Sequence, residues 1–352
     1  MKVDTSYISK KYETYLLQGT KAVKLTLGEW KEVEIEDEED GNEGGDGEDE
    51  GPMMEYRVVP IDDPVEMPAA QIVEDNPVHK YEIIESPVKK IRVGYLMYNS
   101  FTAGTKAEPE KYNNELRSVS QKFKEAGVQA VILDLRYNEG GSMDCVQLLG
   151  TILTSADRLG EPMAYLEYND KNTDKDATIL FGTDREINLN LHSLIAITSG
   201  TTMGAPEMLI RSLFLEDTYP IATVGSSTKG QNVATEQFIN EEFLWSVNPV
   251  VCTVYNSQHD TYGAISPATD LKVSETTIDG STNYSEFLPF GTFDKDGKSE
   301  RLLKIAIGVL DGTYPPKDDE TPEESTTQTR FKVEKSVSSP ASRRFSSKGL
   351  RL

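Results

Sequence analysis

The sequence predicts an α/β fold with a largely parallel β-sheet as its main domain. From residue 90 onward, runs of apolar and β-branched residues alternate with segments whose apolar residues recur at helical spacing. This alternation is typical of parallel α/β sheets. Residues 193–210 add a buried strand, a tight turn and a helix start in direct succession. A chain of 352 residues is long enough for one large core with smaller appendages.

The elements of this domain are expected in a definite order. The strands cover residues 91–98, 128–135, 163–168, 194–198, 221–225, 233–238 and 243–255. Helices are expected at residues 109–126, 145–153 and 301–310. The first helix is followed by Gly127 as a C-terminal stop, and its apolar stripe has helical spacing: Tyr112, Leu116, Val119 and Phe123.

Composition divides the chain into five segments. Residues 1–30 hold two strand-like stretches and one helix-like stretch, which is too little to bury a core alone. Residues 31–56 are acidic, rich in glycine and without a calcium-loop frame, which predicts a disordered insert. Residues 57–90 connect this insert to a core at residues 91–313. Residues 314–352 are rich in Pro, Ser and Thr and then basic, which predicts a flexible tail or, alternatively, a docking segment for an acidic partner.

Charge and residue types exclude several classes of function. A net charge of -23 argues against binding to nucleic acid or to anionic lipid. No run approaches the ~20 apolar residues of a membrane span, and the chain shows no signal peptide. The histidines lack the spacing of a zinc site, so neither a metal nor a cofactor is expected. Cys145 and Cys252 lie in apolar contexts, which favours buried free thiols over a disulfide.

Two segments have the layout of an active site without its reactive side chains. In residues 193–210, the strand-turn-helix joint would lift one residue out of the sheet beside unpaired helix N–H groups. That geometry suits a nucleophile and its oxyanion, yet the residue at the apex is Gly204. Residues 221–232 form a strand that leads into a glycine-containing loop. A phosphate-loop interpretation fails because Gln231 and Asn232 stand where Lys and Ser or Thr are required.

The motif LDLRYNEGG at residues 133–141 is similar to the L-D-L-R-x-N-x-G-G motif of the tail-specific, or C-terminal processing, serine peptidases. Residues 91–101, 225–230 and 266–270 resemble further segments of that family in the expected order. The resemblance implies a crotonase-like (ββα) core that carries a serine–lysine dyad, with a partial PDZ-like segment at residues 1–30.

The sequence is most similar to members of this family from Bacteroidetes-type bacteria. This resemblance implies an exported protein of the periplasm or cell envelope, and a lipoprotein anchored through a missing N-terminal part. It also implies peptide or unfolded protein C-termini as partners.

The resemblance places neither member of the dyad in this chain. Gly204 stands at the position of the nucleophilic serine, and Gln231 stands at the position of the lysine base. A dyad needs a hydroxyl to attack and a neutral amine to accept its proton. Glycine has no hydroxyl, and an amide oxygen is far too weak a base. We therefore predict that the chain does not catalyse peptide hydrolysis.

The frame around these two positions matches the family better. Gly140, Gly141 and the N–H of Ala205 match its oxyanion-hole positions, and Glu207 matches an acid that supports the dyad. Three functional hypotheses follow. The first is an inactive homologue that binds peptide or protein C-terminal segments. The second is an active serine-type endopeptidase with a displaced pair such as Thr202 and Lys229. The third is a purely structural surface protein.

Overall fold

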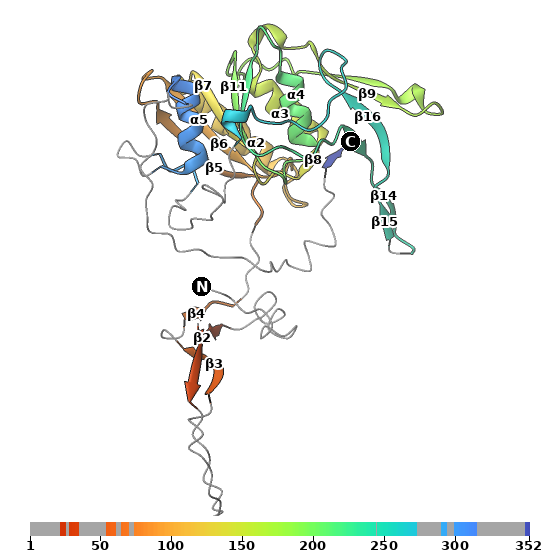
Figure 1. Ribbon diagram of the computed structural model, residues 1–352. Helices are drawn as coiled ribbons and strands as arrows, with labels where there is room; N and C mark the ends of the chain where they lie inside the picture. Colours follow the sequence, from red (N-terminus) through yellow and green to blue (C-terminus); the bar gives the residue numbers. More distant parts are fainter. Residues whose placement is uncertain are drawn as a thin grey trace, which may run out of the picture. The chain divides into compact units, whose positions relative to one another are not determined.

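The computed structural model describes residues 22–25, 28–34, 54–60, 65–69, 74–243, 245–272, 290–293, 299–314 and 349–352. The chain divides into two units. The larger one spans Asp75–Thr329 and Phe345–Leu352 and holds the core. Both units appear in Figure 1.

The described residues of the smaller unit form two pairs of antiparallel strands. β1 (Val23–Leu25) pairs with β4 (Val65–Met67), and β2 (Gly28–Glu34) pairs with β3 (Met54–Pro60). Residues 31–34 and 54–56, the two ends of the expected acidic insert, are paired in β2 and β3, and residues 35–53 lie outside the described residues. Residues 1–21 and 26–27 of the segment expected to resemble a PDZ domain lie outside the described residues.

The centre of the larger unit is a five-stranded sheet in the order β12-β11-β7-β6-β5. Neighbouring strands are parallel from β12 to β6, as expected, and only the edge strand β5 is antiparallel. The strands are β5 (Val78–Glu85), β6 (Arg92–Tyr98), β7 (Ala130–Asp134), β11 (Leu194–Thr198) and β12 (Ile221–Gly225).

The core begins at β5, at residue 78, and not at the expected residue 91. This edge strand is largely exposed and carries charged residues along its length. It therefore has no continuous apolar run, which is the signal that predicts a buried strand.

A second, mixed sheet has the order β10-β9-β16-β13-β17-β8. The pairs from β10 to β13 are antiparallel, whereas β17 is parallel to both of its neighbours. Its strands are β8 (Gly140–Ser142), β9 (Pro162–Tyr168), β10 (Ala177–Leu180), β13 (Val233–Thr235), β16 (Val250–Tyr255) and β17 (Gly349–Arg351). The expected strands at 233–238 and 243–255 are each interrupted, because β14 (Phe238–Asn240) and β15 (Trp245–Val247) form a separate hairpin.

β17 is the largest departure from the sequence-based expectations for this unit. Residues 314–352 were expected to be a flexible tail, and Gly349–Arg351 instead form a strand inside the sheet. In Figure 1 this blue strand lies beside β8 at the end of the chain. A three-residue strand whose partners come from two distant segments leaves almost no pattern in the local sequence.

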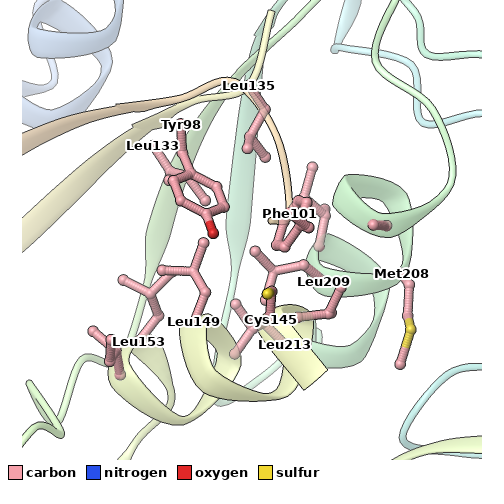
Figure 2. Packing of buried hydrophobic residues seen from close by; sticks show 14 of the residues in the cluster. Tyr98, Phe101, Leu133, Leu135, Cys145, Leu149, Leu153, Met208, Leu209 and Leu213 are labelled. Carbon is pink, nitrogen blue, oxygen red and sulfur yellow. The ribbon is translucent and has the colours of Figure 1, made fainter. Parts of the chain in front are cut away.

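Helices cover both faces of the parallel sheet, in agreement with the predicted fold class. Side chains at alternate positions of a strand point to opposite faces, so Val93, Tyr95 and Met97 pack with α5 while Leu96 and Tyr98 pack on the other face. That second face carries the helices shown from close by in Figure 2. The helices are α2 (Lys111–Glu125), α3 (Met143–Leu153), α4 (Ala205–Leu213) and α5 (Arg301–Asp311).

In the part of the chain that the structure describes, short 3-10 helices lie at Ala156–Arg158, Thr173–Lys175 and Thr269–Leu271. Among the described residues, no helix is both long and apolar enough to cross a membrane.

The prediction of buried free thiols is confirmed for both cysteines. Burial raises the pKa of Cys145 from its usual 9.0 to about 12 and that of Cys252 to about 11. Each folded-state pKa lies above the unfolded value. The stability that each protonated thiol contributes is therefore complete below about pH 9 and falls as the pH rises toward 11 or 12.

We expect the folded chain at pH 8 to react with a thiol reagent far more slowly than the unfolded chain, because thiolate is the reactive form and both thiols are buried. The measurement is the rate of disulfide exchange with an aromatic disulfide, with and without guanidinium. Rapid reaction of both thiols in the folded chain would contradict the buried positions.

Candidate active site

The turn before α4 presents Gly204 at the N-terminus of the helix. Gly204 has φ +71° and ψ -102°, a conformation that favours glycine. Ala205 begins the helix and is fully buried, and Pro206 follows in the first turn, where a missing N–H costs little. The backbone N–H of Met203 donates to the carbonyl of Asn138 (3.1 Å), which joins this turn to the 133–141 motif.

The side chain of Glu207 ties the helix start to the loop after β12. Its carboxylate is fully buried and accepts the backbone N–H of Gly204 at 2.8 Å and that of Gln231 at 2.8 Å. It also accepts the N–H of Gly230 and the hydroxyl of Thr228. A buried carboxylate needs such donors to offset its desolvation. Glu207 is therefore the connection that holds the positions of Gly204 and Gln231 together.

The two glycines predicted for the oxyanion hole form β8. Gly140 and Gly141 have φ values of +117° and +135°, which other residues rarely adopt. Asn138 fixes this strand, because its side-chain oxygen accepts the N–H of Gly140 (3.0 Å) and its amide donates to the carbonyl of Tyr98 (2.8 Å). A side chain on Gly141 would meet the backbone of Phe101, which pairs with it.

A buried cluster of charged side chains holds the motif at residues 133–141 in place. The guanidinium of Arg136 lies 2.7 Å from Asp134 and 3.0 Å from Glu300, and the side chains of all three residues are almost fully buried. Glu300 also accepts the backbone N–H of Leu303 at the start of α5 (2.9 Å). Burial, reinforced by Asp134, raises the pKa of Tyr95 well above its usual range, so its hydroxyl stays protonated and donates to Asp134 (2.7 Å).

The cluster also shapes the turn that leads to Gly204. The backbone carbonyl of Arg136 accepts the hydroxyls of Ser199 and Thr201, the latter at 2.7 Å. Both hydroxyls belong to the loop between β11 and α4. The motif thus positions β8 through Asn138 and the apex of the turn through the carbonyl of Arg136.

β17 lies across the positions predicted for the site. A Cβ atom on Gly204 would lie 2.5 Å from the nitrogen of Leu350 and 2.7 Å from the carbonyl carbon of Gly349. A Cβ atom on Gly140 would lie 2.5 Å from that same carbon of Gly349. The peptide bond between Gly349 and Leu350 therefore occupies the space next to the predicted nucleophile and oxyanion-hole positions.

The side chain of Gln231 reaches the same point from the other loop. A Cβ atom on Gly349 would lie 2.9 Å from Cδ of Gln231. The side-chain oxygen of Gln231 is buried and has no hydrogen-bond partner among the described residues. Gln231 and Gly204 therefore both lie against Gly349, and the role of position 231 as a base position stays a prediction.

The alternative pair Thr202 and Lys229 lacks the geometry of a dyad. The Thr202 hydroxyl is fully buried, donates to the carbonyl of Leu135 (2.9 Å) and accepts the N–H of Ser199 (3.0 Å). Lys229 bonds to Thr202 only through backbone atoms (3.1 Å), and its side chain is exposed. Both hydrogen bonds of the Thr202 hydroxyl therefore hold the turn.

A test for this pair is covalent labelling with a serine-reactive phosphonate. We expect mass spectrometry to find no adduct on Thr202, because a buried hydroxyl without a base does not attack. An adduct on that residue would restore the active-enzyme alternative.

Two supporting elements were missing from the sequence-based site. Glu300 lies far from Arg136 in the chain, and nothing in its own segment indicates that the two pair. Gly349–Arg351 carries only a weak alternation of apolar residues. Within the described residues, no cluster of three or more metal-ligating side chains is present.

Comparison with known proteins supports the family that the motif indicates. The profile of Peptidase family S41 matches residues 92–248. An S41 protein from Bacteroides fragilis has a crystal structure with a TM-score of 0.66 and 35% sequence identity. The match covers 87% of this chain and 70% of that one. The chain therefore belongs to peptidase family S41.

More distant solved structures match with lower scores. The photosystem II D1 C-terminal processing protease has a TM-score of 0.43 and 16% identity, with 60% of this chain and 52% of that one covered. A Parabacteroides merdae protein has a TM-score of 0.41 and 20% identity, with 66% of each chain covered. No curated protein matches this chain. The family assignment rests on the Bacteroides fragilis structure.

Proposed function

We propose that this member of family S41 binds extended peptide segments, including protein C-terminal segments, without cleaving them. The observation that carries the proposal is the contact between the predicted site and a strand of the chain itself. Gly204, Gly140 and Gln231 all lie against the backbone of Gly349. The site thus has room for an extended backbone and offers no group that attacks it.

The absence of hydrolysis follows from the side chains at positions 204 and 231. Removing the nucleophile of a serine protease alone lowers turnover by about a million-fold. Here the base position carries Gln231 as well, and the nearest hydroxyl in the turn, that of Thr202, is bonded on both sides. Gly141 of β8 and the N-terminus of α4 can still offer N–H groups to a peptide carbonyl, whereas the N–H of Gly140 is donated to Asn138.

The edges of β8 and β13 support the binding of a peptide strand. In the structure a strand lies between them and satisfies both edges. Peptides that add a strand to a sheet gain affinity from main-chain hydrogen bonds, and side-chain pockets supply specificity. The slot between β8 and β13 is therefore suited to unfolded or terminal segments, which present a free backbone.

The cellular setting belongs to the same proposal. The family resemblance supports an exported protein of the periplasm or cell envelope. A ligand there would be the accessible end of another exported protein.

A peptide-display screen tests the proposal. We expect the folded chain to capture a set of peptides with apolar residues near their ends and to leave them intact on prolonged incubation, as followed by mass spectrometry. New termini produced by the unmodified chain would refute the non-hydrolysing function. The absence of any captured peptide at about 1 mM, both by the unmodified chain and by a variant in which residues 349–352 no longer cover the site, would refute peptide binding.

The hairpin of β14 and β15 supplies the control for unspecific capture. Phe243, between its two strands, is 68% exposed, and it lies outside the slot. A Phe243→Ser variant should capture the same peptides as the unmodified chain. If the variant no longer captured these peptides, the binding surface would be the hairpin and not the slot.

A further inference from the structure

We infer that Gly349–Leu352 is this site's own ligand, and that the slot selects a glycine followed by an apolar residue. This inference rests on the proposed function and adds two points to it: the class of peptide that fits and the way in which access is controlled. The chain covers its own site, and another peptide enters only when this segment leaves.

The first step is the way in which the segment is held. Gly349 and Leu350 pair with Gly140 and Gly141 of β8, and Leu350 pairs with Ala234 of β13. The N–H of Gly349 donates to the carbonyl of Glu139 (2.7 Å). The bonds in this segment are made mainly by the backbone, as they are for a peptide that adds a strand.

The opposite end of the segment is held in the same manner. The N–H of Leu352 donates to the carbonyl of Thr235 (3.1 Å). The hydroxyl of Thr235 donates to the carbonyl of Leu350 (3.1 Å). Any extended peptide could make the backbone bonds, so selectivity has to come from the side chains.

The second step is the fit at Gly349. Its φ is +100°, which excludes most other residues. A Cβ atom there would overlap the side-chain amide of Gln231. Gly140 and Gly204 face the segment and also have no room for a Cβ atom. Three glycines thus allow one backbone to approach two others, and a ligand needs glycine at this position.

The third step is the burial of the next residue. Leu350 is only 1% exposed and belongs to the main apolar cluster, together with Ala205 and Leu209 of α4. Leu352 is 41% exposed, so its side chain adds little. Leu350 is therefore the one fully buried side chain of this segment, and Arg351 beside it is half-buried.

Covering of the site in cis has a quantitative consequence. A linked segment acts at an effective concentration in the millimolar range. A free peptide must displace this segment before it binds. The apparent affinity of the free peptide therefore falls by the ratio of the effective concentration to the dissociation constant of the segment for the slot. If the segment binds the slot as a free peptide with a dissociation constant below about 0.1 mM, its release should therefore strengthen the binding of any competing peptide by about 10-fold or more.

The experiment uses the full chain and a fluorescent peptide with the sequence of residues 345–352, FSSKGLRL. Leu350→Asp places a charge in the apolar position and releases the segment. Leu352→Asp makes the same change two residues further on, at an exposed side chain, and is the matched control. We expect the Leu350→Asp chain to bind the peptide at least about 10-fold more tightly than either the unmodified chain or the control.

A second pair of variants covers the case in which Leu350→Asp fails to fold. Gly349→Val cannot adopt the backbone conformation of the slot, whereas a Cβ atom on Gly263 meets nothing within 4 Å. Gly263→Val is therefore its control. Peptides in which the glycine is replaced by valine, or the following leucine by aspartate, should bind none of these chains.

Hydrogen exchange gives a readout that needs no free peptide. The amides of Gly349 and Leu352 should be protected in the unmodified chain and exchange freely in the released variants. Unprotected amides in the unmodified chain, or equal peptide affinity with and without release, would overturn the inference and leave the proposed function intact. Failure of every captured peptide to bind the released variants would instead overturn the proposed function, and this inference with it.

Discussion

Replacement of Arg136 by methionine is expected to lower the free energy of unfolding by about 3–5 kcal/mol. The guanidinium lies between Asp134 and Glu300, both almost fully buried, and methionine would leave two carboxylates without a counter-charge. Methionine keeps much of the packing volume, so the loss reflects charge rather than a cavity. Urea unfolding followed by circular dichroism measures the change.

The matched control is Arg117→Met on the surface of α2. Arg117 forms an exposed pair with Glu110 at 3.7 Å, and such pairs contribute less than about 1 kcal/mol. Equal losses in the two variants would mean that the buried cluster does not hold the motif in place.

Replacement of Glu207 by alanine is expected to destabilise the chain by at least about 3 kcal/mol, because each buried donor left without a partner costs about 1–3 kcal/mol. The backbone N–H groups of Gly204, Gly230 and Gln231 and the Thr228 hydroxyl would all lose their acceptor. The same unfolding experiment measures the loss. Hydrogen exchange should also show residues 228–231 opening locally.

Two further variants, Glu207→Gln and Glu216→Ala, are the controls for this loss of stability. Glutamine keeps one acceptor oxygen, so its loss should be smaller than that of alanine. Glu216 is an exposed acid just after α4, and its removal should change stability by less than about 0.5 kcal/mol. A loss for Glu207→Ala as small as that for Glu216→Ala would show that the loop is held by other contacts.

The parallel sheet was predictable because its strands are buried on both faces and read as continuous apolar runs, as in Ala130–Asp134 and Leu194–Thr198. The edge strand β5 was not, because its exposed positions carry charge. β17 was not either, since its place depends on close approach of glycine backbones in three separate segments. Such a fit is a property of the folded state and leaves no periodic pattern.

The candidate site was also predictable only in part from the sequence. The turn at Gly204 could be located from a strand, a glycine and a helix start in succession, and Glu207 from its place in the first helical turn. The four bonds that Glu207 accepts could not be foreseen, because three of their donors come from the distant loop of residues 228–231. The link from Arg136 to Glu300 is equally remote in sequence.

The most direct test of a site that holds peptides without cleaving them is the cleavage of an unfolded protein, followed by mass spectrometry. The comparison uses the unmodified chain and the Gly204→Ser, Gln231→Lys double variant, each with and without Leu350→Asp to uncover the site. We predict no cleavage wherever Gly204 and Gln231 are present. Cleavage should appear only when both are replaced, with or without Leu350→Asp, because a serine side chain at position 204 already displaces the segment. Cleavage by a chain that retains Gly204 and Gln231 would contradict the account.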